Sequence, residues 1–167
     1  MYGRTDEARS NTSNPLDLIE EMAAAHEWVF DRTADEELVT QIAGRWGNYS
    51  LHFAWSHDNS ALQVFCGVDL RVPRHRRGAV NELLLQANTR MWLGHFDLPE
   101  DDDMPIFRHT VPLRGIRGAS VEQLEDLIEG AVNECERYHP AFQYVVWGGK
   151  SASEAIAAAL LDTQGEA

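Results

Sequence analysis

The chain has 167 residues, of which 27 are acidic and 14 basic, and its formal net charge is −13 at pH 7. This length fits a single domain that can bury a hydrophobic core without help from disulfides. So acidic a surface repels phosphate backbones and anionic lipids, which argues against nucleic acid and membrane as partners. No stretch approaches the roughly 18 apolar residues of a membrane helix. The first residues carry no signal peptide either, so we expect a cytoplasmic location without membrane insertion.

The N-terminal residues divide into a tail and a helix. Residues 1–13 are polar and aperiodic, and we expect them to form a flexible tail ahead of a single domain at 14–167. Asn14 followed by Pro15 is typical of a helix start. Apolar residues at helical spacing then predict a short amphipathic helix to about His26.

The following part of the chain alternates apolar and polar residues with a period of two. This pattern is typical of half-buried strands. It predicts antiparallel strands in a meander with one face buried, at residues 28–30, 38–43, 49–56 and 62–68.

The second half of the chain returns to helical spacing. Residues 74–90 predict a second helix, and two more strands are expected at 92–98 and 105–112, joined by the acidic loop 99–103. The order of helix, strand meander, helix, two strands and helices predicts an α+β fold with an antiparallel sheet packed against helices.

A capping box of Ser120 and Gln123 opens the clearest amphipathic helix. Pro140 is expected to interrupt this helix, because proline lacks the N–H that the helix needs. The apolar run 141–147 is predicted to restart as a helix, with a strand as the alternative. Ser151 and Glu154 then form a second capping box for a last helix.

Reactive groups do not gather at any motif spacing. None of the seven histidines has a second ligand at a metal-motif distance. Glycine-rich phosphate loops and a nucleophile elbow are also missing from the sequence. We therefore expect no catalytic residues, no metal and no cofactor. Cys66 and Cys135 are interpreted as small buried hydrophobic residues, and a disulfide between them stays open.

Two features are candidate partner-binding sites. One is a basic cluster at the start of the second helix, where cations oppose the helix dipole, made of Arg71, Arg74, Arg76 and Arg77. It suggests an ion-pair contact with the chain's own acidic loop or with a second subunit, and a solvated face is the alternative. The other is Trp46, which lies in a turn between strands and could anchor an interface. The other four tryptophans are expected to lie in the core.

Four segments resemble the YbjN family, which is described as a group of bacterial sensory transduction regulators. They are MWLGHFDL at 91–98, MPIFRH at 104–109, ECERYHPAF at 134–142 and VWGGK at 146–150. The resemblance covers residues 14–167 and implies a fold similar to type III secretion chaperones. It carries over no catalytic residues.

These observations favour a non-enzymatic, protein-binding regulatory or chaperone-like module. We expect a protein partner, whose identity the sequence does not give, and a homodimer. The fold analogy and the open sheet edge support this interpretation. The alternative function is a small-ligand sensor, with a pocket lined by Trp92, His95, Phe107 and His109.

Overall fold

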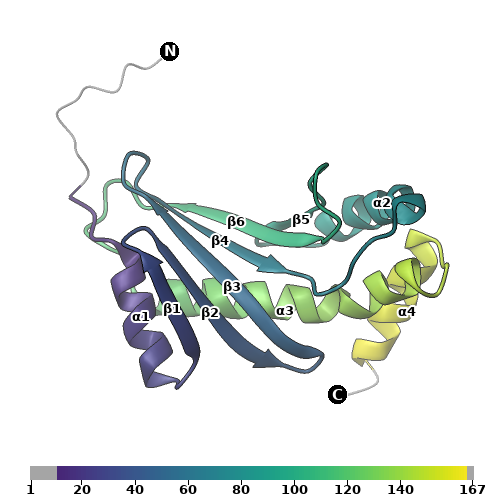
Figure 1. Ribbon diagram of the computed structural model, residues 1–167, viewed down its shortest axis with the longest axis horizontal. Coiled ribbons are helices and arrows are strands. Elements are labelled where there is room, and N and C mark those ends of the chain that lie inside the picture. The colour runs from purple at the N-terminus through teal and green to yellow at the C-terminus, as the bar shows by residue number, and fades with distance from the viewer. Residues whose placement is uncertain (1–10, 165–167) are drawn as a thin grey trace, which may run out of the picture.

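The computed structural model describes residues 11–164 and has the predicted α+β architecture (Figure 1). A single-turn 3-10 helix, η1, accompanies the strands and α-helices. In chain order the elements are α1 (Pro15–Ala25), β1 (Val29–Ala34), β2 (Glu37–Gly44), β3 (Gly47–Ser56), β4 (Ala61–Gly67), η1 (Arg74–Arg76), α2 (Arg77–Asn88), β5 (His95–Asp97), β6 (Ile106–Pro112), α3 (Val121–Val146) and α4 (Ala152–Gln164).

The strands form one antiparallel sheet in the order β1-β2-β3-β4-β6-β5. The first four strands are the predicted meander. After β4 the chain passes through η1 and α2 and returns as the β5–β6 pair, with β6 beside β4. The predicted meander and the predicted strand pair are therefore both confirmed.

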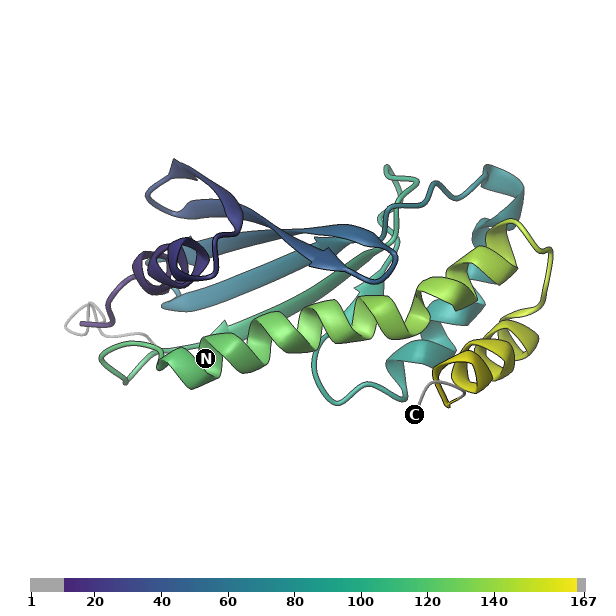
Figure 2. The ribbon, with the colours of Figure 1, turned by 90° about the horizontal axis from the view of Figure 1, so that it is seen from below.

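The sheet and α3 form two layers. In Figure 1 α3 runs behind the strands, and Figure 2 shows it beneath one face of the sheet. Alternation along β3 directs Leu51, Phe53 and Trp55 into the core between the layers. Burying each such side chain stabilises the fold by about 1.5–3 kcal/mol. α1 lies near β1 at one end of the sheet, and α2 and α4 lie at the other end.

The prediction that Pro140 interrupts the helix is wrong, because α3 continues through it to Val146. A proline inside a helix costs about 3 kcal/mol or more. Here Pro140 is buried together with its neighbours, including Tyr138, Ala141 and Phe142. Burial of this segment offsets the lost hydrogen bond, and the predicted helical state of 141–147 is confirmed as far as Val146.

The strand predicted at 92–98 is shorter than expected, because β5 spans only His95–Asp97. Gly94 has a positive φ of 69°, which turns the chain just before the strand. The Asn88 side chain then bonds both the N–H and the carbonyl of Phe96, at 2.7 and 3.0 Å. The end of α2 therefore positions this short edge strand.

The predicted N-terminal tail lies mostly outside the described residues. Its last part is attached to the loop before α3. The Thr12 hydroxyl donates to the carbonyls of Leu113 and Ile116, and the Ser13 N–H donates to the carbonyl of Arg117. Among residues 11–164, no helix is both long enough and apolar enough to cross a bilayer.

Candidate functional site

Two arginines of the basic cluster bind the acidic loop 99–103. Arg71 pairs with the Asp103 carboxylate at 3.0 Å, although its side chain is 84% exposed. Arg77 donates to the backbone carbonyls of Leu98, Pro99 and Asp102. The contact between this cluster and the chain's own acidic loop is therefore present within one molecule.

Arg76 has a different structural role. Its guanidinium donates to the carbonyl of Val145 at 2.9 Å and to that of Lys150 at 3.0 Å. These carbonyls lie at and just beyond the C-terminal end of α3, where a cation is favourable. Arg74 is exposed, and its side chain forms no hydrogen bond or ion pair with any described residue. Within the basic cluster, Arg74 is thus the one arginine whose guanidinium makes no contact with a described residue.

Trp46 lies in the turn between β2 and β3 and is 42% exposed. One face of its ring stacks on His139 of α3, with centroids 5.8 Å apart, and the Arg45 guanidinium lies 4.9 Å from the ring. The Arg45 N–H also donates to the Glu136 carboxylate. Burial lowers the pKa of His139, and the charges of Asp69 and Glu136 partly oppose this shift. The turn is thus attached to α3 while part of Trp46 stays accessible.

The expectation that the other four tryptophans lie in the core is wrong for two of them. Trp92 is 78% exposed and Trp147 is 67% exposed, both more than Trp46. Trp92 lies in the turn before β5 and Trp147 directly follows α3. Both positions are chain reversals, where a side chain need not face the core.

The four residues suggested as a ligand pocket have different environments. Phe107 is fully buried, whereas Trp92 is largely exposed. His109 pairs with Val64 and faces α3, while His95 is exposed and pairs with Arg108, whose side chain points to the other face of the sheet. Burial and the neighbouring His95 lower the pKa of His109. The structure therefore spreads these side chains over the core and both faces of the sheet.

The face of the sheet away from α3 carries a row of paired side chains. Phe65 on β4 has its ring 5.9 Å from that of His52 on β3 and 5.7 Å from the guanidinium of Arg108 on β6. Arg108 in turn contacts the Asp97 carboxylate at 3.3 Å. Because these side chains already interact with one another, the row offers few unpaired groups to a partner.

A groove of about 180 Å³ opens between α1, the turn that leads from α1 to β1, β2 and the N-terminal half of α3. Its lining combines apolar, aromatic and acidic side chains: Met22, His26, Trp28, Ile42, Glu125, Ile128, Glu129, Val132 and Asn133. The apolar members belong to the helix and strand patterns in the sequence, and none of them was predicted as a site residue. The signal that points to them in the sequence is the spacing of Glu125 and Glu129 beside Ile128 and Val132.

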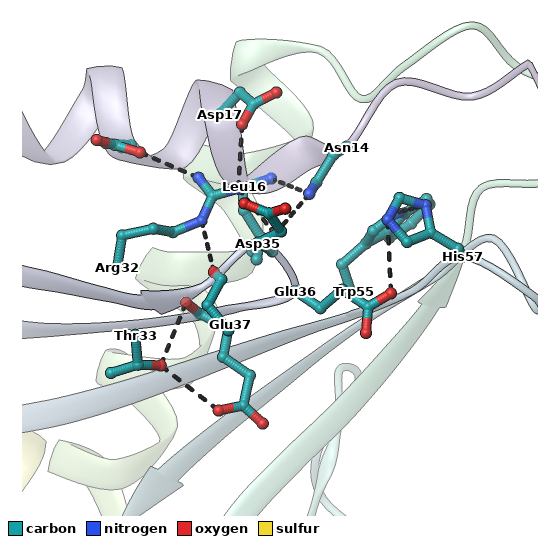
Figure 3. Close-up of polar contacts among 12 residues, drawn as sticks. Asn14, Leu16, Asp17, Arg32, Thr33, Asp35, Glu36, Glu37, Trp55 and His57 are labelled. Carbon is teal, nitrogen blue, oxygen red and sulfur yellow. Dashed lines mark hydrogen bonds and ion pairs between the residues drawn. The ribbon is translucent and has the colours of Figure 1, made fainter.

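Arg32 on β1 holds α1, one wall of the groove, in place (Figure 3). Its guanidinium pairs with Asp17 at 3.1 Å and with Glu20 at 3.0 Å, and its side chain is only 19% exposed. It also donates to the backbone carbonyls of Ala34 and Asp35. A single side chain thus joins α1 to the β1–β2 turn.

Asn14 makes a second connection at the same place. Its side-chain oxygen accepts from the Leu16 N–H at 2.9 Å, as the predicted helix cap does, and its amide donates to the Asp35 carbonyl at 2.7 Å. Both contacts appear in Figure 3. Asn14 therefore connects the start of α1 to the β1–β2 turn, the same turn to which Arg32 connects Asp17.

The other end of α1 forms the aromatic wall of the groove. Glu27 has a φ of 57°, an uncommon conformation for a residue other than glycine, and it turns the chain from α1 toward β1. His26 and Trp28 on either side of this turn stack with centroids 4.7 Å apart and an interplanar angle of 12°. This pair presents a flat, partly polar surface to the groove.

Glu134 of α3 is the most deeply buried carboxylate among the described residues, with 7% of the residue exposed. Its Oε2 has no hydrogen-bond partner among the described residues, and Arg137 lies 4.0 Å away. Burial raises the pKa of Glu134, and Arg137 partly opposes this. Within residues 11–164 no group of three or more metal-ligating side chains gathers.

Comparisons with known proteins agree with the motifs in the sequence. The chain is similar in structure to YbjN from E. coli, whose crystal structure is described as that of "a putative transcription regulator". The TM-score is 0.53 at 11% identity, over 81% of this chain and 91% of that one, so this likeness concerns the fold alone. A search of curated proteins finds no match. The family model for YbjN, "Putative bacterial sensory transduction regulator", matches residues 15–144, which is most of the chain. The chain therefore belongs to the YbjN family.

Proposed function

We propose that this protein is a non-enzymatic regulatory module that acts by binding another protein. The observation that carries the proposal is the groove between α1 and α3, where apolar side chains are bordered by carboxylates. Protein interfaces typically combine an apolar centre with a polar rim. The description of the family as a regulator, and not as an enzyme, supports a function through contact.

A small-ligand sensor is the weaker proposal. The groove measures about 180 Å³, whereas pockets for drug-sized ligands usually measure about 300–1,000 Å³. Side chains of a protein segment can enter a shallow groove one at a time, so its size suits a protein partner better. Trp46 and Arg74 are further candidate contacts, and a homodimer and a cytoplasmic location remain part of the proposal.

Affinity purification from the native bacterium tests the proposal. The groove variant is Val132→Gln, which places an amide in the apolar wall. Its control is Val121→Gln, an exposed valine of the same helix that does not line the groove. We expect a protein that the wild type and the control retain and the groove variant loses. The proposal is wrong if all three retain the same proteins, or if only a small molecule co-purifies.

A further inference from the structure

The groove has a charge that restricts its partner. Glu125 and Glu129 are both exposed and lie four residues apart on α3, so their carboxylates occupy the same side of the helix. Neither carboxylate forms an ion pair or hydrogen bond with another residue in the described part of the chain. The acidic rim is therefore available to a cation from outside.

The position of Glu129 is not explained by helix stability. Acidic residues stabilise the first turn of a helix through the dipole, and this effect accounts for Glu122. Glu129 lies in the third turn, beyond the range of that effect. Like charges four residues apart also destabilise a helix by a few tenths of a kcal/mol. A cation bound between Glu125 and Glu129 would remove this repulsion.

The other walls of the groove add two requirements for an occupant. One wall is apolar and is formed by Met22, Ile42 and Ile128. Burial of a hydrophobic side chain against this wall is favourable. Trp28, flattened against His26, offers an aromatic face that attracts a guanidinium or ammonium group. The net charge of −13 attracts basic partners over a longer range. An apolar residue flanked by Lys or Arg satisfies all of these groups together.

We propose that the groove between α1 and α3 binds a basic amphipathic segment of a partner protein. Apolar side chains of the segment lie between Met22, Ile42 and Ile128, and its cations pair with Glu125 and Glu129. This inference rests on the proposed function and specifies the chemistry of the partner. It also predicts that association weakens as salt rises, since the carboxylates are exposed.

Fluorescence anisotropy with two labelled model peptides tests the inference. Both have about 18 residues, enough to form a helix, and share one leucine pattern, with lysine in one peptide and glutamate in the other. The test variant is Glu125→Gln/Glu129→Gln. The control is Glu122→Gln/Asp126→Gln, which removes the same charge from α3 outside the groove lining.

We expect the Leu/Lys peptide to bind the wild type more tightly than the Leu/Glu peptide. Loss of two exposed ion pairs should weaken its binding about fivefold in the test variant. The control should stay within about twofold of the wild type, since long-range attraction is mostly screened at physiological salt. Equal affinity for both peptides, or equal weakening in both double variants, would overturn the inference.

Further measurements separate this inference from the function on which it rests. If Val132→Gln weakens both peptides equally, the groove binds protein segments without charge selection, and only the inference fails. If Val132→Gln changes neither affinity, the groove is not a protein-binding site, and the proposed function fails too.

Other occupants of the groove are tested separately. Sedimentation without peptide tests a second copy of the chain. If the wild type is a dimer and Val132→Gln is not, the second copy is the occupant and the partner segment is not. Deletion of residues 1–10 tests the chain's own terminus, which would be the occupant if peptide affinity then rises.

Discussion

Cys66 of β4 and Cys135 of α3 bring their thiols together across the interface between the sheet and the long helix. Both residues are fully buried, and both are free thiols in this structure. Interaction with the Cys66 thiol and the burial of the site together raise the pKa of Cys135. The two cysteines are therefore packed as the sequence predicted, and they lie close together.

Replacement of Cys135 by alanine should flatten the pH dependence of stability in mildly alkaline solution. The unfolded thiol loses its proton near pH 8.5, while the folded thiol keeps it. The unfolded state then binds fewer protons, so the free energy of unfolding falls as pH rises above about 8.5. Denaturant titrations between about pH 8 and 9 stay at least about one pH unit below the tyrosine pKa of about 10. Identical slopes for the wild type and Cys135→Ala would contradict the prediction.

Arg76→Met should lower the free energy of unfolding by about 1.5–3 kcal/mol, the usual value for hydrogen bonds that involve a charged group. The cause is the loss of the bonds to Val145 and Lys150 at the end of α3. Arg74→Met is the matched control, because Arg74 is exposed, and its effect should stay within about 0.5 kcal/mol. Thermal unfolding of both variants checks this. Equal losses would show that Arg76 is not a structural residue.

The features that sequence predicted well depend on neighbouring residues. The alternation in β3 and the capping box of Ser120 and Gln123 are both present as expected. A cap is decided within four residues, and strand alternation follows from the pleat itself. The fold class and the order of the elements follow from signals of this kind.

The features that sequence missed depend on contacts between distant segments. Pro140 stays helical because the sheet and other helices bury it, which no local rule includes. Arg76 reaches the carbonyls of Val145 and Lys150 at the far end of α3. The groove forms where α1 packs beside the sheet and α3, and Arg32 contributes to that packing by joining α1 to β1. The helix or strand of most lining residues could be predicted from the sequence, but the packing that brings them together could not.

Glu134→Gln should raise the free energy of unfolding at neutral pH, by on the order of 1 kcal/mol. Burial raises the pKa of Glu134, so the folded state holds a proton that the unfolded state releases above about pH 4.3. Stability therefore falls as pH rises from that value through the folded pKa, and glutamine removes this loss. Chemical denaturation at about pH 4 and pH 7 measures it. Glu129→Gln, exposed on the same helix, is the control and should gain only the few tenths of a kcal/mol that its repulsion from Glu125 costs.

Arg32→Lys should loosen α1 and weaken binding in the groove at the same time. Lysine keeps the charge but cannot bond Asp17, Glu20 and the carbonyls of the β1–β2 turn together, as the planar guanidinium does. We expect a loss of about 1 kcal/mol in stability, because the guanidinium is largely buried while its partners Asp17 and Glu20 are exposed and their charges are screened by solvent. Hydrogen exchange should rise in α1, which supplies Met22 and lies next to His26, more than in α4. Arg114→Lys, an exposed arginine before α3, is the control. If exchange in α1 is unchanged, Asn14 and the apolar face of α1 suffice to hold this wall, and Arg32 does not shape the groove.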